Sequence, residues 1–333
     1  MMKLTEKERS VLTALQCGIE PVARPFRGLA LPETEVVALL QRARAAGLIR
    51  RFGGVFDARR LGYQSILCAM DPAGRDLEAV AAVIARHPGV THCYERRPLQ
   101  DAAGYPALWF TLAMLREAFD EGLAALRAQL PGDRLLLLPA LRRFKIDVVF
   151  DLRTRDRDEQ VPGGALAPPE SSPAACPLND RERALVRLLD ELDPVSARPF
   201  DQVAGRLGQP VREVTARLQR WRQQGLLRRI AAVLRHREAG FTVNGMCVWS
   251  VGPEAVAAGR RVAACRAVTH CYQRPRLEEF PFDLYAMIHA ASRPEAVRLY
   301  QEITAACGLP PGMMFVSLRE FKKTSMKYFS DAT

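Results

Sequence analysis

Apolar residues recur with a helical period over the first part of the chain. Residues 4–17 place their aliphatic side chains on one face of a helix. A second periodic run over residues 31–47 has Pro32 in its first turn and Gly47 at its end, which suits the start and the stop of a helix. A basic Leu-Ile-Arg-Arg segment then leads into a strand. This order predicts a winged helix-turn-helix.

The pattern then changes to alternating strands and helices. Short apolar runs rich in β-branched and aromatic residues indicate strands, and longer amphipathic runs indicate helices. The resulting order is β-α-β-β-α-β, which predicts a ferredoxin-like sandwich. The expected elements are strand 65–70, helix 76–86, strands 90–95 and 108–115, helix 117–129 and strand 135–138.

The sequence contains this whole unit twice, one copy after the other. Val90–Tyr94 returns identically as Val268–Tyr272, and Arg24–Phe26 returns as Arg198–Phe200. Such collinear repetition indicates a tandem duplication. The second ferredoxin-like unit is expected to use residues 244–251, 254–264, 268–273, 284–290, 294–307 and 313–318.

The predicted fold class is therefore α+β, with two tandem units. Residues 151–177 hold five prolines and no aromatic residue, so they cannot bury enough apolar area to fold and are expected to be a linker. The predicted domains are winged helix-turn-helix 1–62, ferredoxin-like ligand domain 63–150, linker 151–177, winged helix-turn-helix 178–240 and ferredoxin-like ligand domain 241–330.

Composition narrows the class of protein. The 333 residues include no apolar run of the roughly 18–20 residues that a membrane-spanning helix needs, so no membrane association is expected. The eight cysteines form no CxxC pair, and the first residues are charged, so we expect a cytoplasmic protein. The net charge of +11 favours an anionic partner, either nucleic acid or a polycarboxylate or phosphate ligand.

A winged helix-turn-helix followed by a ferredoxin-like ligand domain resembles the Lrp/AsnC family of bacterial transcription regulators. Finer motifs are similar to the siroheme decarboxylases, with the two halves resembling the two subunits of such an enzyme in fused form. In the first half the motifs are Arg50–Asp57, Leu61–Tyr63, Gly89–Tyr94 and Leu108–Leu112, and in the second half they are Arg228–His236, Ala239–Phe241, His270–Pro275 and Tyr285–His289.

The resemblance implies a specific reaction. Siroheme decarboxylases remove two acetate carboxyls from siroheme and give 12,18-didecarboxysiroheme, which feeds synthesis of the haem of a nitrite reductase or of haem by the alternative route. The resemblance implies no oxygen and no added cofactor, because the iron belongs to the substrate. Siroheme is then the expected partner, and a homodimer of the fused chain stays open.

Such a ligand needs cations for its carboxylates, and arginine can hold a carboxylate through paired hydrogen bonds. A pair of neighbouring arginines is often only part of the solvated surface. Here, however, two arginine clusters of the first half recur in the second half. The expected substrate-binding clusters are Arg50 with Arg51, Arg96 with Arg97, Arg228 with Arg229, and Arg274 with Arg276.

Histidines carry the strongest signal. On a strand, His92, Tyr94 and Arg96 share one face, and His270, Tyr272 and Arg274 do the same in the second half. A lone histidine on a strand is often a core residue, but this stripe suits the wall of a polyanion site better than a core.

Two further histidines, His236 and His289, occur only in the second half, where the first has Ala58 and approximately Met114. We expect His92, His270 and His236 to be catalytic, and Tyr94, Tyr272 and His289 to contact substrate. A separate metal site is not expected, because the His-Cys dipeptides lack the usual zinc spacing.

These residue types suggest a mechanism. Loss of carbon dioxide from an acetate leaves electron density that the macrocycle can absorb, and one imidazole then donates a proton. The other imidazole orients the substrate or ligates the iron, and the arginines fix which carboxyl is lost. The sequence leaves open which half is productive and in which order the acetates leave.

The main alternative is a DNA-binding regulator. In the first half, however, the expected recognition helix begins with Glu33 and Glu35, whose carboxylates would repel phosphates, so DNA binding by this half is not expected. The corresponding residues 209–215 of the second half are ambiguous in this respect. Symmetric DNA half-sites are read by identical units rather than by two unlike halves, so DNA binding is not expected of the whole chain. A further alternative is a module that senses or carries haem without turnover.

Overall fold

The computed structural model describes residues 2–72, 74–99, 103–130, 134–146, 149–150, 152, 174–190, 192–193, 196–235 and 237–330. Most of the predicted linker lies outside these residues. The α+β class and the tandem arrangement are confirmed. Among the described residues, no helix combines the length and apolar character needed to cross a membrane.

Each half begins with a helix that is capped in the same way. The backbone N–H of Glu8 donates to Thr5 Oγ1 while Glu8 Oε2 accepts from the Thr5 N–H. Asn179 and Glu182 repeat this reciprocal pair in the second half. Such a capping box satisfies N–H groups that have no partner within the helix, so it fixes where each helix starts.

The elements of the first half follow the predicted order, with one strand more than predicted. They are α1 (Glu6–Cys17), α2 (Glu33–Ala45), β1 (Ile49–Phe56), β2 (Tyr63–Asp71), α3 (Leu77–Arg86), β3 (Val90–Pro98), β4 (Leu108–Leu115), α4 (Arg116–Ala128), β5 (Arg134–Pro139) and β6 (Arg142–Ile146).

The second half contains one more α-helix in its helix-turn-helix. Its elements are α5 (Asp180–Asp190), α6 (Pro199–Leu207), α7 (Val211–Gln223), β7 (Leu227–Leu234), β8 (Val243–Trp249), η1 (Gly252–Glu254), α8 (Ala255–Ala264), β9 (Val268–Gln273), β10 (Leu284–Ala290), α9 (Arg293–Ala306) and β11 (Met313–Lys323). Where α6 stands here, residues 21–31 of the first half form bends and turns, with Gly28 at a positive φ of 87°.

The halves are joined by exchange of their last strands. The large sheet has the order β5-β2-β4-β3-β11-β8-β10-β9-β6. Strand β11 pairs with β8 of its own half and then with β3 of the other half, while β5 pairs with β2 and its continuation β6 pairs with β9. The two edge strands of the sheet, β5 and β6, therefore follow each other directly in the chain. The strand order has a pseudo-twofold symmetry that relates the two halves.

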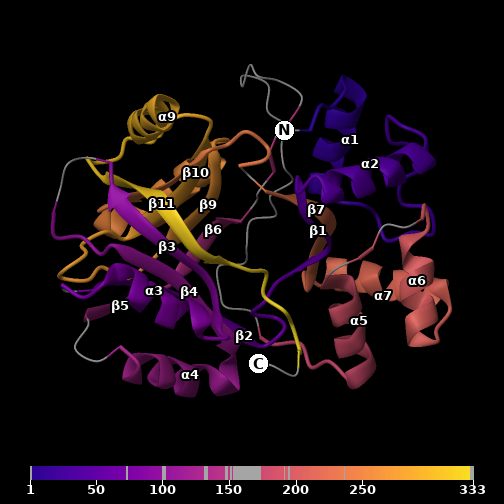
Figure 1. Cartoon of the computed structure of the whole chain (residues 1–333), viewed down its shortest axis with the longest axis horizontal. Helices are drawn as coiled ribbons and strands as arrows, with labels where there is room; N and C mark the ends of the chain where they lie inside the picture. Colours follow the sequence, from indigo (N-terminus) through magenta and orange to yellow (C-terminus); the bar gives the residue numbers. More distant parts are fainter. Residues whose placement is uncertain are drawn as a thin grey trace.

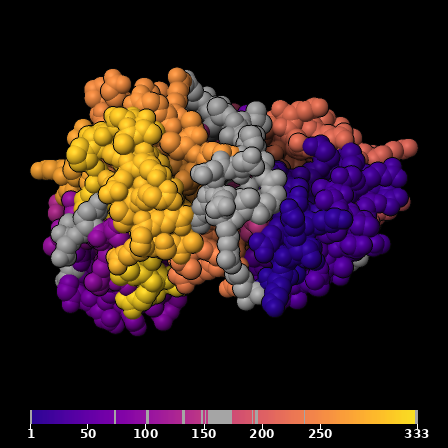
Figure 2. Space-filling model, turned by 90° about the horizontal axis from the view of Figure 1, so that it is seen from above, coloured from indigo at the N-terminus to yellow at the C-terminus, as the bar shows by residue number. Residues whose placement is uncertain are grey.

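The molecule has two lobes, and each lobe contains both halves (Figures 1 and 2). In one lobe the wings β1 and β7 pair antiparallel, and the surrounding helices share one core. In the other lobe α3 and α4 cover the first half of the sheet, and α8 and α9 cover the second. An aromatic cluster around Trp109, Phe280 and Phe315 packs between the two halves of the sheet.

Candidate active site: a cavity between the two halves

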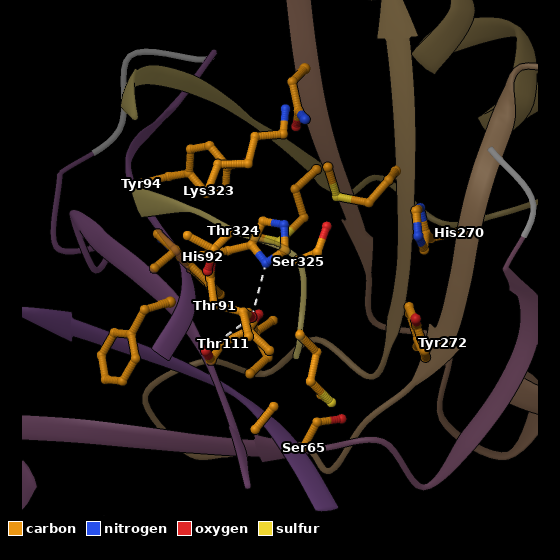
Figure 3. A pocket seen from close by; sticks show the side chains of 18 of the residues that line it. Ser65, Thr91, His92, Tyr94, Thr111, His270, Tyr272, Lys323, Thr324 and Ser325 are labelled. Atoms are coloured by element: carbon orange, nitrogen blue, oxygen red, sulfur yellow. Dashed lines mark hydrogen bonds between the residues drawn. The ribbon is translucent and has the colours of Figure 1, made fainter. Parts of the chain in front are cut away.

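A cavity of about 520 Å³ lies between the two halves of the large sheet, on the side of the winged lobe. This volume is within the range of small-molecule sites. Its walls come from both halves, because β3 and β9 supply equivalent residues and the C-terminal segment after β11 closes one side. In Figure 3, His92 and His270 approach the cavity from opposite walls.

The predicted stripes on the two central strands line this cavity. In the first half, His92 and Tyr94 stack with their ring centroids 6.2 Å apart, and the Arg96 guanidinium lies 5.2 Å from the Tyr94 centroid. In the second half, His270 and Tyr272 stack at 6.3 Å. The alternation of side chains along a strand thus brings imidazole, phenol and guanidinium onto one wall in each half.

Two buried guanidiniums in the cavity wall have no opposite charge beside them. Arg96 is 6% exposed and Arg274 is 9% exposed. Arg96 Nη2 donates to the Asn244 amide oxygen at 3.2 Å, and Arg274 donates to the backbone carbonyl of Leu138. Among the described residues, no carboxylate forms an ion pair with either of them, and Arg96 Nη1 and Arg274 Nε lack a hydrogen-bond partner. Buried cations of this kind are costly, so an anionic ligand would offset that cost.

Burial and neighbouring positive charges both act on the His92 imidazole. Burial of the imidazole, together with the charges of Arg50 and Lys323, lowers the pKa of His92 to about 3. Arg50 itself has its pKa lowered by burial, and its Nη2 donates to Ser325 Oγ at 2.8 Å. His92 is therefore neutral near pH 7 while no anion is bound. Its Nδ1 lies 2.9 Å from Thr91 Oγ1.

Several predicted site residues take other places. Arg51 lines the cavity, but it donates to the backbone carbonyls of Gly54 and Asp190. Arg97, Arg228, Arg229 and Arg276 do not line this cavity, so their contact with the substrate stays a prediction. His236 lies outside the described residues.

Different features of the structure place these arginines outside the cavity wall. Successive side chains of a strand point to opposite faces, so Arg97 lies on the face of β3 that is turned away from the cavity, where it pairs with Glu95. Arg228 donates to Asp57 Oδ2 at 2.8 Å. Arg276 lies beyond the end of β9 and is exposed.

Sequence reasoning missed part of the wall. Asn244, Tyr285 and Lys323 line the cavity, together with Ser325. Tyr285 had a detectable signal, because it opens the Tyr285–His289 motif, and in the structure it stands directly opposite Tyr272. Lys323 had none, since its position depends on the pairing of β11 with the other half.

The described residues do not form a metal centre of their own. Among them, no three His, Cys, Asp or Glu side chains come together as metal ligands. His92 and His270 reach the cavity singly, so each could supply one ligand to an iron carried by a bound macrocycle.

The chain is similar to known proteins along nearly its whole length. Residues 60–145 and 238–322 match the AsnC-like ligand binding domain, and residues 182–228 match the siroheme decarboxylase NirDL-like HTH domain. The siroheme decarboxylase of Hydrogenobacter thermophilus is 34% identical over 96% of this chain and 94% of its own length. The siroheme decarboxylase NirDL subunit of Paracoccus pantotrophus is 33% identical over 97% of both chains.

Solved structures agree with these sequence matches. The crystal structure of the siroheme decarboxylase NirDL has a TM-score of 0.71 and 29% identity, covering 98% of this chain and 96% of the other. The crystal structure of NirDL in complex with an iron-uroporphyrin III analogue gives the same TM-score, identity and coverage.

Proposed function

This chain belongs to the siroheme decarboxylase family, and we propose that its reaction, the decarboxylation of siroheme, takes place in the cavity between the two halves. The product is 12,18-didecarboxysiroheme, formed by loss of two acetate carboxyls, and it serves haem biosynthesis. The observation that carries this placement is the pair of buried guanidiniums, Arg96 and Arg274, which face the cavity without a counter-charge.

Binding follows from charge and shape. Siroheme is a flat macrocycle rimmed with carboxylates, and the cavity offers cations on both walls with aromatic rings beside them. The Nη1 atom of Arg96, which has no partner among the described residues, can donate to a carboxylate oxygen. Charge-assisted hydrogen bonds of this kind are the strong ones in proteins, so they fix the orientation of the ring.

Catalysis then needs one proton for each carboxyl lost. The C–C bond to the carboxylate breaks, carbon dioxide leaves, and the electron pair moves into the conjugated ring. A proton then adds to the same carbon and leaves a methyl group. The macrocycle serves as the electron sink, so no added cofactor is required, and the proton comes from His92 or His270.

Substrate binding itself would prepare His92 for this role. Its pKa is about 3 because of burial and neighbouring cations. Bound carboxylates neutralise those cations and so raise the pKa of His92, while burial, the larger cause of its low value, continues to oppose protonation. The imidazole then takes up a proton with the substrate and can give it to the carbon that has lost its carboxyl.

The regulator alternative is not favoured. The two wings, which would flank a DNA duplex, pair with each other through β1 and β7. Glu33 at the start of α2 forms an ion pair with Arg24. The wings and the start of α2 are therefore engaged in contacts within the protein rather than left available for DNA.

Two observations bear on the working unit and on the compartment we expect for it. One chain supplies both walls of the cavity, so a homodimer of the fused chain is not needed to complete the site. None of the eight cysteines, all of which lie among the described residues, forms a disulfide, and this supports our expectation of a reducing compartment such as the cytoplasm. Analytical ultracentrifugation of the purified chain would establish its assembly.

The decisive experiment is anaerobic incubation of the purified chain with siroheme, followed by mass spectrometry of the tetrapyrrole. We expect stepwise loss of two molecules of carbon dioxide. Siroheme that binds, as seen by its absorbance, but leaves with unchanged mass would overturn the proposal and indicate a carrier. The Arg96→Met and Arg274→Met variants should bind it more weakly, whereas Arg97→Met, outside the cavity, should bind it normally.

A further inference from the structure

We propose that Arg235 and Arg237 form a steering site at the rim of the cavity, where they attract the carboxylates of the incoming macrocycle and speed its association. We call these two residues the rim arginines. The inference rests on the proposed function, because it takes siroheme as the ligand. It goes beyond that function in assigning a role to two exposed arginines that do not line the cavity themselves.

The rim arginines directly follow a strand that reaches the cavity. Strand β7 ends with Val233 and Leu234, and both of these residues line the cavity. Just beyond the end of the strand, the side chains of Arg235 and Arg237 are exposed to solvent. The rim arginines therefore stand where the cavity wall meets the surface of the winged lobe.

Backbone hydrogen bonds hold this part of the chain in place. The N–H of Arg235 donates to the carbonyl of Leu48 in the first half at 2.9 Å, and the Arg235 carbonyl accepts from the N–H of Ala239 at 3.0 Å. The carbonyl of Arg237 accepts from the N–H of Gly240, also at 3.0 Å. Gly240 has a positive φ of 93°, a conformation that costs glycine little. The two arginines are therefore presented from a fixed backbone.

The charges of the rim arginines act on side chains inside the cavity. Burial is the main cause that lowers the pKa of Arg50, and the charge of Arg235 lowers it further. Burial likewise lowers the pKa of Lys323, with a contribution from Arg237, and Arg237 also opposes the rise that burial causes in the pKa of Tyr94. Interactions between charges weaken with distance and are screened by salt over about 10 Å. Because the three affected residues all line the cavity, the rim arginines lie close to its opening.

The rim has an excess of positive charge. Lys323 forms an ion pair with Glu320 at 3.6 Å, which balances one of the cations. In the part of the chain that the structure describes, neither rim arginine forms an ion pair with a carboxylate. Glu238 is exposed next to them in the sequence and offsets part of their charge. With Arg50 included, four cations stand against two carboxylates, which leaves a net charge of about +2 for an anionic ligand to meet.

Cations accompany the ligand from the solvent to the interior. The rim arginines are exposed, and Arg50 and Lys323 behind them are half-buried. Arg96 and Arg274 are buried, and His289 lines the same cavity. A ligand with several carboxylates can therefore exchange one cation for the next as it enters, while water is removed in steps. The rim arginines act at the start of this path, before the macrocycle is fully bound.

Exposed cations speed binding more than they strengthen it. A positive surface potential raises the local concentration of an anion and can increase its association rate by roughly 10–1,000-fold at low ionic strength. An exposed ion pair adds little to the stability of the bound state, because water and salt screen it. The rim arginines are therefore expected to raise the association rate constant and to leave dissociation and chemistry nearly unchanged.

Stopped-flow absorbance measurements of siroheme binding under anaerobic conditions test this division. The double variant Arg235→Gln/Arg237→Gln should associate with siroheme about 5–20-fold more slowly than the parent at low ionic strength. Its dissociation rate and its single-turnover rate of carbon dioxide loss should stay within about twofold of the parent. Near 1 M salt, where charges are screened beyond about 3 Å, the two proteins should associate with siroheme at similar rates.

Two matched double variants separate charge from position. Arg235→Lys/Arg237→Lys keeps both charges at the rim and should associate within about twofold of the parent, since steering needs charge rather than a particular hydrogen bond. Arg212→Gln/Arg220→Gln removes two charges from exposed positions of α7 that do not line the cavity. Its effect on the association rate should be at least about threefold smaller than that of the rim variant, because salt screens distant charges.

The outcomes separate the two proposals. An unchanged association rate in Arg235→Gln/Arg237→Gln at low salt would overturn the steering site while the proposed function stands. Faster dissociation with unchanged association would also overturn it, because the rim arginines would then hold the bound ligand. An equal loss in the α7 variant would show that net charge acts and not the rim. If siroheme binds to the parent but no carbon dioxide is released, the proposed function fails, and the association rates still decide on the steering site.

Discussion

The guanidinium of Arg274 lies 4.9 Å from the centre of the Tyr272 ring. A second ring, that of Tyr285, lies 5.5 Å from the same guanidinium. Aromatic faces attract a cation, but they do not neutralise it. The protein thus keeps a buried positive charge available in the cavity wall, and Arg96 over Tyr94 repeats the arrangement in the other half.

Replacing either buried arginine should weaken the binding of siroheme without lowering the free energy of unfolding. Arg274→Met and Arg96→Met remove a guanidinium without a counter-charge but keep much of its volume. We expect siroheme to bind roughly 10–100-fold more weakly, the equivalent of one or two charge-assisted hydrogen bonds. The free energy of unfolding should not fall, because a buried charge is no longer desolvated.

Absorbance titration and urea unfolding measure these two effects separately. Arg97→Met is the matched control, since Arg97 is exposed and outside the cavity. Equal affinity in Arg97→Met and Arg96→Met would contradict the role assigned to the buried pair.

His92 should make the empty protein sensitive to mild acid. An unfolded histidine binds a proton near pH 6.5, whereas burial and neighbouring cations lower the pKa of His92 to about 3 in the folded chain. Between these values the unfolded state binds more protons, so stability is present above pH 6.5 and is lost as the pH falls. Relative to His92→Gln, the parent should lose roughly 2 kcal/mol between pH 6.5 and pH 5.

Urea unfolding of both proteins at several pH values gives this difference, and above pH 7 the difference should no longer change. Parallel stability curves for the parent and His92→Gln would show that His92 titrates normally in the fold.

Asp57 should be a major determinant of stability. Burial raises its pKa, but the guanidiniums of Arg143 and Arg228 outweigh burial and lower the pKa well below its ordinary value. Its Oδ2 accepts from Arg143 at 2.6 Å and from Arg228 at 2.8 Å, which ties the wings to β6. Asp57→Asn leaves these cations without a partner and should cost about 3 kcal/mol in the free energy of unfolding.

The control is Asp193→Asn, because Asp193 is exposed and its contact with Arg44 is long, at 3.4 Å. That variant should unfold within about 0.5 kcal/mol of the parent. A similar cost for both variants in urea unfolding would argue against the special position of Asp57.

Gly53 should tolerate no side chain, for steric reasons. A Cβ atom there would lie 2.4 Å from the carbonyl oxygen of Leu189, at the end of α5. The backbone on both sides would have to move, so Gly53→Ala should destabilise the winged lobe by about 2 kcal/mol. In α6, Gly205 has open space at its Cβ, and Gly205→Ala should stabilise the protein by up to about 1 kcal/mol. Thermal unfolding of the two variants should therefore shift in opposite directions.

Local pattern predicted most elements because strand and helix periodicity are local properties. The alternation along residues 90–96 and 268–274 also identified the two imidazoles, phenols and guanidiniums that share the cavity. What the pattern could not supply was the exchange of strands. Residues 142–146 were not among the predicted strands, and in the structure they form β6 by pairing with β9 of the other half.

The same limit applies to the site. Arg228 belongs to a conspicuous basic cluster, yet Asp57 holds it outside the cavity wall, and this ion pair depends on how the two wings meet. Lys323 enters the cavity because β11 continues into the first half. The asymmetry at His289 was visible in sequence, but its partner Asn244 required the register of β8 and β10.

Strand exchange has a consequence for the covalent connection between the halves. Because β11 pairs with β3 and β6 pairs with β9, each half completes the sheet of the other through backbone hydrogen bonds. If a protease cut the chain between residues 153 and 173, the two fragments would therefore stay associated in one complex. Fusion guarantees that the two parts are produced in equal numbers, while the interface itself keeps them together.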